Sequence, residues 1–312
     1  MRTALGIDIG GTDIKLGIVD EAGKILESGT IPTRAAEGPR AAALRIDEWY
    51  RRSSGADPGV SAAGADCAGL IDGSRGWLYV SPNLPGWGGI DLASLLREAL
   101  RLPVTLDNDV NCAAWGEYLH GAGRGTEHFI CITLGTGIGG GVVIGGRLYR
   151  GWQGLAGEVG HQVVTEAGPM CTCGTVGCLE AAANAASIVR RARDLIADGG
   201  ASVLPATGPL TAREVFEAAT RGDRVALEAL AMTGRALGRG LANLVHLFNP
   251  EVIAVGGGVA GAGELILAPA REAMREMLMD EVLAEVRIVP AALGNSASLV
   301  GASMMAFATA ER

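Results

Sequence analysis

The strongest constraint on the fold is a strand, a glycine–threonine turn and a second strand, which occur once in each half of the chain. The first copy reads LGIDIGGTDIKLGIV over residues 5–19, and the second reads ICITLGTGIGGGVVI over residues 130–144. Apolar, β-branched runs interrupted by glycine predict β-hairpins. The likeness of the two segments indicates an internal duplication, although two unrelated glycine-rich hairpins would give the same pattern.

The remaining pattern predicts an α/β protein of two domains, because 312 residues exceed one ordinary core. A strand meander over residues 4–31 precedes the first helix, which favours mixed rather than parallel sheets. Glycines at 121, 123 and 125 suggest a boundary, with a first domain over 1–120, completed by a C-terminal helix of about 296–312, and a second over 121–295. We expect further strands near 61–70, 103–107, 252–255 and 286–289, and helices near 36–53, 91–100, 109–119, 180–197, 211–220, 224–247 and 263–278.

Charge and hydropathy exclude several classes of protein. A net charge of −8 argues against a nucleic-acid binder, which needs a basic face. No apolar run reaches the roughly 18 residues that span a bilayer, and Asp8 interrupts any signal-peptide core, so we expect no membrane partner and a cytoplasmic location. Thiols stay reduced there, so the six cysteines call for an explanation other than disulfides.

Four of the potential metal ligands lie close together in the sequence: His161, Cys171, Cys173 and Cys178. Three thiolates and one imidazole form a closed tetrahedral set, which is typical of structural rather than catalytic zinc. Redox-active thiols or chance clustering would be the alternatives. Cys67, Cys112 and Cys131 stand among apolar residues and are expected in the core.

Three glycine-rich turns are candidates for holding phosphates, because glycine lets backbone N–H groups approach an anion. Neither hairpin is followed by the Gly-Lys-Ser/Thr of a P-loop, and neither leads into a helix as a Rossmann turn does. A glycine triplet after a later strand suits the approach of an adenosine, although it is a weak signal alone. The candidates are Asp8, Gly10, Gly11 and Thr12; Gly135, Thr136 and Gly137; and Gly256, Gly257 and Gly258.

A run of acids and amides, Asp107 to Asn111, ends one predicted strand and opens a helix. Helix capping alone would explain one or two of these residues. An ionised carboxylate at a helix N-terminus is stabilised by the backbone dipole and could accept a proton from an attacking hydroxyl. Asp109 is therefore the candidate general base, and Asn108 a candidate hydroxyl-binding neighbour.

Sugar hydroxyls would find acceptors beside the predicted zinc loop. Glu158 precedes the loop and Glu180 follows it, so a bound metal would fix both backbones. Solvated surface acids are the plainer interpretation of each residue alone. The segment Ser81–Trp87 adds an amide at Asn83 and an aromatic ring at Trp87.

Taken together, these motifs resemble the ROK family of sugar kinases and sugar-responsive repressors, in particular its bacterial glucokinase branch. The resemblance extends over essentially the whole chain and rests on seven segments: GIDIGGT, SPNLPGW, LDNDVNCAAWGE, TLGTGIGGG, GEVGH, CTCGTVGCLE and IAVGGGV. It implies an actin-like (ribonuclease H-like) two-domain ATPase fold whose cleft closes on sugar and nucleotide. It also implies that Asp109 is the base, that Asn83, Asn108, Glu158, His161 and Glu180 touch the sugar, and that His161 also serves the metal.

The activity implied is transfer of a phosphoryl group from ATP, with Mg²⁺, to the 6-hydroxyl of a hexose. Glucose is the first choice of acceptor, followed by N-acetylmannosamine and then fructose or allose, and polyphosphate is an alternative donor. The family often forms homodimers or homotetramers. A sugar-sensing regulator would begin with a helix-turn-helix, whereas this sequence enters a strand by about residue 4. A catalytically idle sugar-binding module would not need Asp109. Asp13 departs from the Lys or Asn that often follows GGT in the family, and Lys15 lies two residues on.

Overall fold

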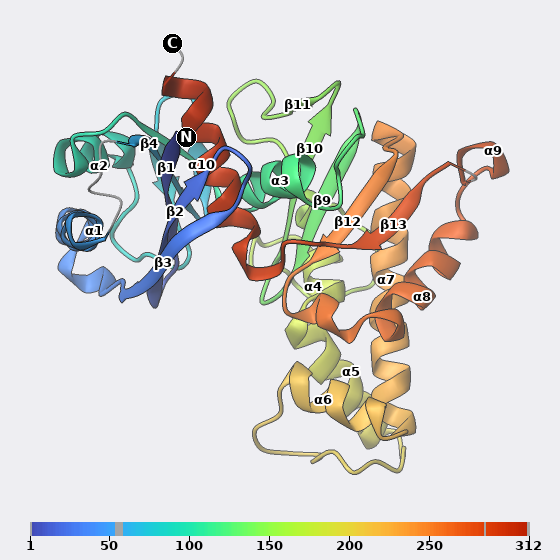
Figure 1. Cartoon of the computed structure of the whole chain (residues 1–312). Helices are drawn as coiled ribbons and strands as arrows, with labels where there is room; N and C mark the ends of the chain where they lie inside the picture. The colour runs from blue at the N-terminus through green and yellow to red at the C-terminus, as the bar shows by residue number, and fades with distance from the viewer. Residues whose placement is uncertain (1, 54–58, 284, 311–312) are drawn as a thin grey trace. The chain divides into compact units, whose positions relative to one another are not determined.

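The structure, a computed structural model, describes residues 2–53, 59–283 and 285–310. Most strands belong to two five-stranded sheets (Figure 1). The first sheet contains β1 (Thr3–Ile9), β2 (Asp13–Asp20), β3 (Ile25–Pro32), β4 (Val60–Cys67) and β8 (Val104–Asn108). The second contains β9 (Phe129–Leu134), β10 (Ile138–Ile144), β11 (Arg147–Leu148), β12 (Val252–Gly256) and β13 (Arg287–Pro290). A small third sheet contains β5 (Leu70–Asp72), β6 (Trp77–Val80) and β7 (Ile90–Asp91).

The two large sheets repeat one topology. Their strand orders are β3-β2-β1-β4-β8 and β11-β10-β9-β12-β13. In the first, β1 pairs antiparallel with β2 and parallel with β4, and β4 pairs parallel with β8. In the second, β10 and β11 are antiparallel, and β12 is parallel to both β9 and β13. The strands correspond one to one, so the predicted duplication and the predicted mixed sheets are both confirmed.

Helices connect these strands, and none among the described residues is both long and apolar enough to cross a bilayer. The α-helices are α1 (Pro39–Arg52), α2 (Leu92–Leu100), α3 (Asp109–His120), α4 (Leu179–Ala183), α5 (Ala185–Ala197), α6 (Ala212–Thr220), α7 (Arg224–Phe248), α8 (Glu264–Arg275), α9 (Asp280–Leu283) and α10 (Ala297–Ala310). Short 3-10 helices are η1 (Ala35–Glu37), η3 (Val159–His161), η4 (Val259–Ala262) and η5 (Gly294–Ser296).

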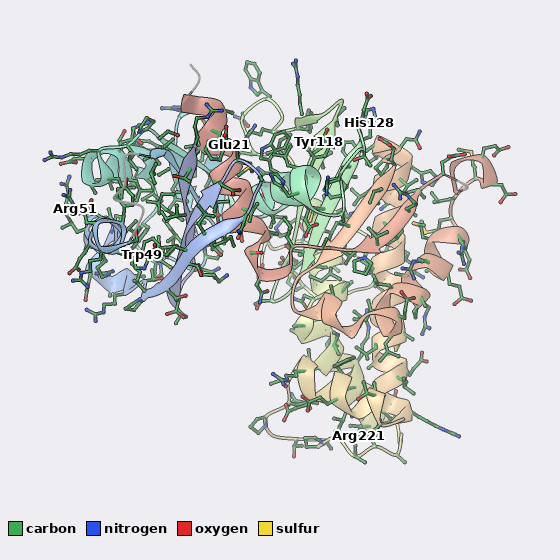
Figure 2. All side chains as sticks on the ribbon, viewed as in Figure 1. Glu21, Trp49, Arg51, Tyr118, His128 and Arg221 are labelled. Carbon is green, nitrogen blue, oxygen red and sulfur yellow. The ribbon has the colours of Figure 1, made fainter. Side chains whose placement is uncertain are left out.

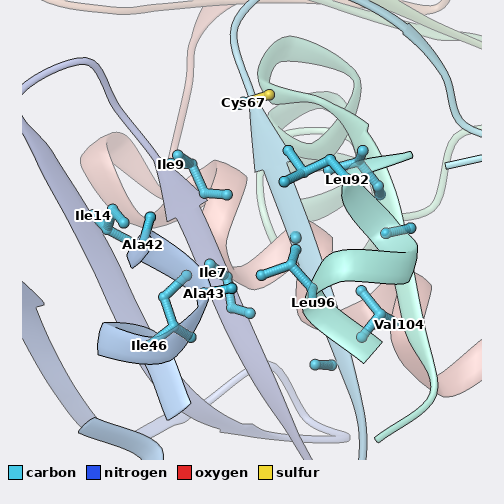
Figure 3. Packing of buried hydrophobic residues seen from close by; sticks show 14 of the residues in the cluster. Ile7, Ile9, Ile14, Ala42, Ala43, Ile46, Cys67, Leu92, Leu96 and Val104 are labelled. Carbon is cyan, nitrogen blue, oxygen red and sulfur yellow. The ribbon is translucent and has the colours of Figure 1, made fainter. Parts of the chain in front are cut away.

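The first sheet is covered on both faces. Figure 3 shows Ile7 and Ile9 of β1 packed with Ile46 of α1 and Leu96 of α2. Figure 2 shows Trp49 of α1 turned toward β3, where it covers Gly29. The other face, which carries Ala4 and Ala62, packs against Val300 and Met304 of α10. Alternate residues of one strand therefore serve two different cores.

Contacts divide the chain into two compact units. Unit 1 consists of 1–125, 141–157 and 292–312, and unit 2 of 126–140 and 158–291. Within unit 1, Gly116 of α3 and Gly301 of α10 allow the two helices to touch backbone to backbone. Within unit 2, Gly234 and Gly238 of α7 do the same against α8. The division into domains at residue 120 stays a prediction.

Several predicted boundaries were wrong. We expected the second glycine turn to extend over 135–140, but it ends sooner, because β10 begins at Ile138. The helix predicted over 180–197 is two helices, since Asn184 takes an extended conformation and its side chain caps α5 by accepting from Ser187 N–H at 2.9 Å. The helix predicted from 36 begins with η1, and Pro39 then opens α1. The short strands β5, β6, β7 and β11 were missed.

Candidate functional site

Three carboxylates lie side by side across the first sheet. The parallel register pairs Asp8 of β1 with Asp66 of β4, and Asp66 with Asp107 of β8. Residues in register on neighbouring parallel strands point to the same face. That face is the one toward α10, because Ser298 Oγ donates to Asp8 Oδ2 at 3.2 Å. We call Asp8, Asp66 and Asp107 the acid row.

Cations pair with the two outer members of the acid row. Lys15 lies opposite Asp8 on β2, and its Nζ donates to Asp8 Oδ2 at 2.9 Å. Arg150 Nε donates to Asp107 Oδ2 at 2.6 Å, and the Asp107 side chain is only 3% exposed. Lys15, two residues after Asp13, thus neutralises Asp8 rather than Asp13.

The middle member, Asp66, is fully buried, and among the described residues neither of its carboxylate oxygens has a hydrogen-bond partner. Burial is the largest cause that raises the pKa of Asp66 well above its ordinary value, and the charges of Asp8, Asp109 and Asp107 add to it while Lys15 opposes it. A buried carboxyl in such surroundings is more stable as the neutral acid. The sequence pattern gave no sign of this group.

The junction of β8 and α3 holds the candidate base. Asn108 caps α3 by accepting from Val110 N–H at 2.8 Å, and its Nδ2 donates to Gly69 O at 3.0 Å. Asp107 Oδ1 accepts from Asn108 N–H at 2.8 Å and from Asn111 Nδ2 at 2.9 Å. Asp109 follows as the first residue of α3. The capping interpretation is confirmed for Asn108, and Asp109 lies in the first turn of α3, where its role as the base stays a prediction.

The loop after β6 lies against the first glycine turn. A Cβ on Gly11 would come within 2.8 Å of Asn83 O, so only glycine fits there. The Asn83 side chain is exposed. Trp87 was expected to offer its ring to a sugar, and that expectation is wrong. Its side chain is 1% exposed, and its Nε1 donates to Ala35 O at 2.9 Å.

In unit 2, the four predicted metal ligands converge. The ligand atoms of His161, Cys171, Cys173 and Cys178 all lie within 4.8 Å of one another. Cys173 Sγ is 3.6 Å from Cys178 Sγ, and Cys171 Sγ is 3.7 Å from His161 Nδ1. Tetrahedral zinc with Zn–S bonds of about 2.3 Å would separate its sulfurs by about 3.8 Å. The four residues therefore fit a zinc ion.

Acids flank this metal loop as expected. His161 Nδ1 faces the sulfurs, and its Nε2 lies 3.8 Å from Glu158 Oε2. The pKa of Glu158 is raised, mainly by burial. The charge of His161 opposes this shift, and the charge of Glu180 adds to it. Glu180 Oε2 accepts from Ile138 N–H at 3.0 Å, and its Oε1 accepts from Thr172 Oγ1 at 3.4 Å. Cys171 Sγ also donates to Oε1 at 3.6 Å, so Oε2 is the oxygen that retains a second lone pair for a sugar hydroxyl.

Two glycine turns of unit 2 also meet. Gly257 takes a φ of +88°, which favours glycine, and a Cβ there would collide with Leu134 O, the residue before Gly135. Thr136, Gly257 and Gly258 are exposed. The end of β12 and the second hairpin thus present their turns together.

The described residues therefore form two sets. Unit 1 contains the first glycine turn, Asn83, Asn108 and Asp109. Unit 2 contains the turn of the second hairpin at 135–137, the metal loop with Glu158 and Glu180, and the glycine triplet. Three residues beside the predicted site residues were not singled out from the sequence: Asp66 and Arg150 in unit 1, and Asn184 in unit 2.

Comparison with known proteins gives a consistent result. The model of the ROK family matches residues 4–309. A glucokinase of Thermotoga maritima is 39% identical over 303 residues, covering 96% of this chain and 95% of the relative. A ROK family glucokinase of Streptomyces griseus, solved in complex with glucose and AMPPNP, is 38% identical, with a TM-score of 0.82 and coverage of 98% and 99%. A ROK hexokinase of Thermus thermophilus is 34% identical, with a TM-score of 0.83 and coverage of 99% of both chains.

Proposed function

The chain belongs to the ROK family, and we propose that it is an ATP-dependent hexose kinase that phosphorylates the 6-hydroxyl of glucose. The fold is accordingly the actin-like, mixed α/β fold of the ROK sugar kinases. The observation that carries the proposal is similarity to glucokinases over almost the whole chain, with Asp109 as the first residue of α3.

Asp109 is the proposed base. It lies in the first turn of α3, where the helix dipole favours a carboxylate. In the proposed reaction it accepts the proton of the sugar hydroxyl as that oxygen attacks the γ-phosphorus and ADP leaves. Asp107 and Asn108 hold the backbone on either side of it, by accepting from the N–H groups of Asn108 and Val110.

Sugar binding is proposed for polar groups of both sets. Asn83 and Asn108 would contribute amides, and Glu158, Glu180 and the Nε2 of His161 would accept from or donate to hydroxyls. A hexose carries no charge, so recognition relies on such directional hydrogen bonds.

Phosphates are assigned to the glycine turns. Gly10, Gly11 and Thr12 form one turn, with Asp8 just before it on β1, and Gly135, Thr136 and Gly137 form the other, while Gly256–Gly258 would lie near the adenosine. Mg²⁺ bound with ATP would supply neutralisation of the phosphate charge. Lys15 places a fixed cation at the first turn through its pair with Asp8.

His161, Cys171, Cys173 and Cys178 are the proposed zinc ligands. Hydrogen bonding to Thr175, the largest cause, lowers the pKa of Cys173 to about 6, whereas burial raises the pKa of its neighbour Cys178 to about 12, so a metal would bind the Cys173 thiolate and displace the proton of Cys178. Four protein ligands leave no open position, so the zinc would be structural. It would fix the loop between Glu158 and Glu180. A homodimer or homotetramer stays a prediction.

The test is an ADP-release assay with ATP and a panel of glucose, N-acetylmannosamine, fructose, allose and mannose. We expect the highest kcat/KM for glucose. A higher value for another hexose would change the acceptor but keep the kinase. No sugar-dependent ADP release with any of them would contradict the proposed function.

A further inference from the structure

The second glycine hairpin is held by one short segment that follows the metal loop. Glu180 Oε2 accepts from Ile138 N–H at 3.0 Å, Asn184 Nδ2 donates to Thr136 O at 3.0 Å, and Ala185 N–H donates to Gly135 O at 2.9 Å. These three bonds reach both sides of the turn at 135–137. All of the residues belong to unit 2.

The fit between this segment and the turn is close. A Cβ on Gly137 would lie 2.6 Å from Glu180 Oε2, a distance that real Cβ contacts do not show. The Glu180 carboxylate therefore occupies the space that any larger residue at 137 would need. The break between α4 and α5 at Asn184 is also required, since an uninterrupted helix would turn neither the Asn184 side chain nor the Ala185 N–H toward the hairpin.

The same segment is attached to the metal loop. Cys178 precedes the first residue of α4, and Glu180 follows two residues later. Thr172, between the ligands Cys171 and Cys173, donates from its Oγ1 to Glu180 Oε1 at 3.4 Å. Glu180 thus bridges the loop that the metal would fix and the turn proposed to hold phosphates.

We propose that Glu180, Asn184 and Ala185 form a clamp through which the metal loop positions the 135–137 turn for the nucleotide, so that Glu180 and Asn184 are positioning residues for ATP. This inference rests on the proposed function. It gives the metal loop a second role beside sugar binding. The turn contributes backbone N–H groups whose direction decides how well a phosphate is held, and the clamp fixes that direction.

Asn184 is the better residue to test, because Glu180 is also assigned to the sugar. Asn184→Ala removes both the clamp bond and the cap of α5. Asn184→Ser keeps a good capping hydroxyl but is too short to reach Thr136 O. Thr211→Ala is the matched control, since Thr211 caps α6 in unit 2 by accepting from Glu214 N–H and makes no bond to the hairpin.

The measurement is the Kd of a non-hydrolysable ATP analogue with Mg²⁺, without sugar, followed by separate KM values for ATP and glucose. We expect both Asn184 variants to weaken nucleotide binding about fivefold to tenfold, as the loss of a hydrogen bond implies, with the KM for glucose unchanged. Thr211→Ala should bind nucleotide like the wild type. Wild-type affinity in Asn184→Ser would assign the effect to capping and overturn the clamp.

The metal arm compares zinc-loaded protein with protein stripped by a chelator. Removing the zinc should weaken binding of the analogue to the wild type. It should also speed amide hydrogen exchange at Ile138, because the Ile138 N–H donates to Glu180. Removing the zinc from Asn184→Ala should raise the Kd of the analogue by a smaller factor than in the wild type, because the substitution and the loss of zinc both act through the clamp. An unchanged Kd on stripping, or unchanged exchange at Ile138, would contradict the coupling. If the wild type binds no analogue at all, the proposed function itself is contradicted. A wild type that binds the analogue but loses no affinity on stripping contradicts only the clamp, so the two failures are distinguishable.

Discussion

Arg150 Nε donates to Asp107 Oδ2 at 2.6 Å. Asp107 immediately precedes Asn108, the N-cap of α3, and Asp109, its first residue. Asp107 is almost fully buried, so this pair is unlike the exposed ion pairs of the surface. Its partner also donates from Nη2 to Met305 Sδ at 3.6 Å, which ties the junction to α10.

Replacing Arg150 by Met should therefore destabilise the fold. It leaves a buried carboxylate unpaired, which costs about 2–4 kcal/mol after allowance for the partly exposed Arg150. Urea unfolding measures this cost. Arg40→Met is the control, because Arg40 and Glu98 are both more than 60% exposed, and its effect should stay below about 0.5 kcal/mol. Equal effects of the two substitutions would show that the Asp107 pair contributes nothing special.

Asp66→Asn should stabilise the protein at neutral and alkaline pH. The folded pKa of Asp66 is raised, so folding binds a proton that the unfolded chain releases above the ordinary value of 3.8. Stability is then lost as pH rises from that value toward the raised pKa, by up to about 1.4 kcal/mol per pH unit. The amide variant lacks this loss. Unfolding at pH 4 and pH 8 should show near-equal stability at pH 4 and a more stable variant at pH 8. A wild type that is as stable as Asp66→Asn at pH 8 would contradict this account.

The sequence was sufficient wherever the signal is local. The glycine turns and the Cys/His spacing each lie within a short segment, so the repeated sheets and the convergent ligands could be predicted. The buried, acid-flanked position of Asp66 could not be predicted, because β1 and β8, which carry Asp8 and Asp107, lie beside it only in the folded sheet. Trp87 was misread for the same reason, since its partner Ala35 is distant in sequence. The break at Asn184 is hidden between alanines, which favour helix on both sides.

Zinc content gives a third prediction. Metal analysis should find one zinc per chain, and Cys178→Ser should lose it together with a large part of the thermal stability, because a structural site contributes its binding energy to folding. Cys67→Ala, which removes a buried thiol outside the metal loop, should keep its zinc. A wild type with no zinc and full stability in chelator would rule out the metal site.

Asp109→Asn tests the central claim most directly. The variant keeps the size of the side chain and loses its basicity, so we expect it to fold, bind zinc and bind glucose, with kcat reduced at least ~10³-fold. Asp91→Asn, which alters the cap of α2 and no candidate site, should keep kcat within about twofold, since a cap affects stability rather than chemistry. The decisive measurement is kcat for glucose phosphorylation by Asp109→Asn: a loss of that size with glucose affinity intact supports Asp109 as the base, and near-normal turnover would contradict it.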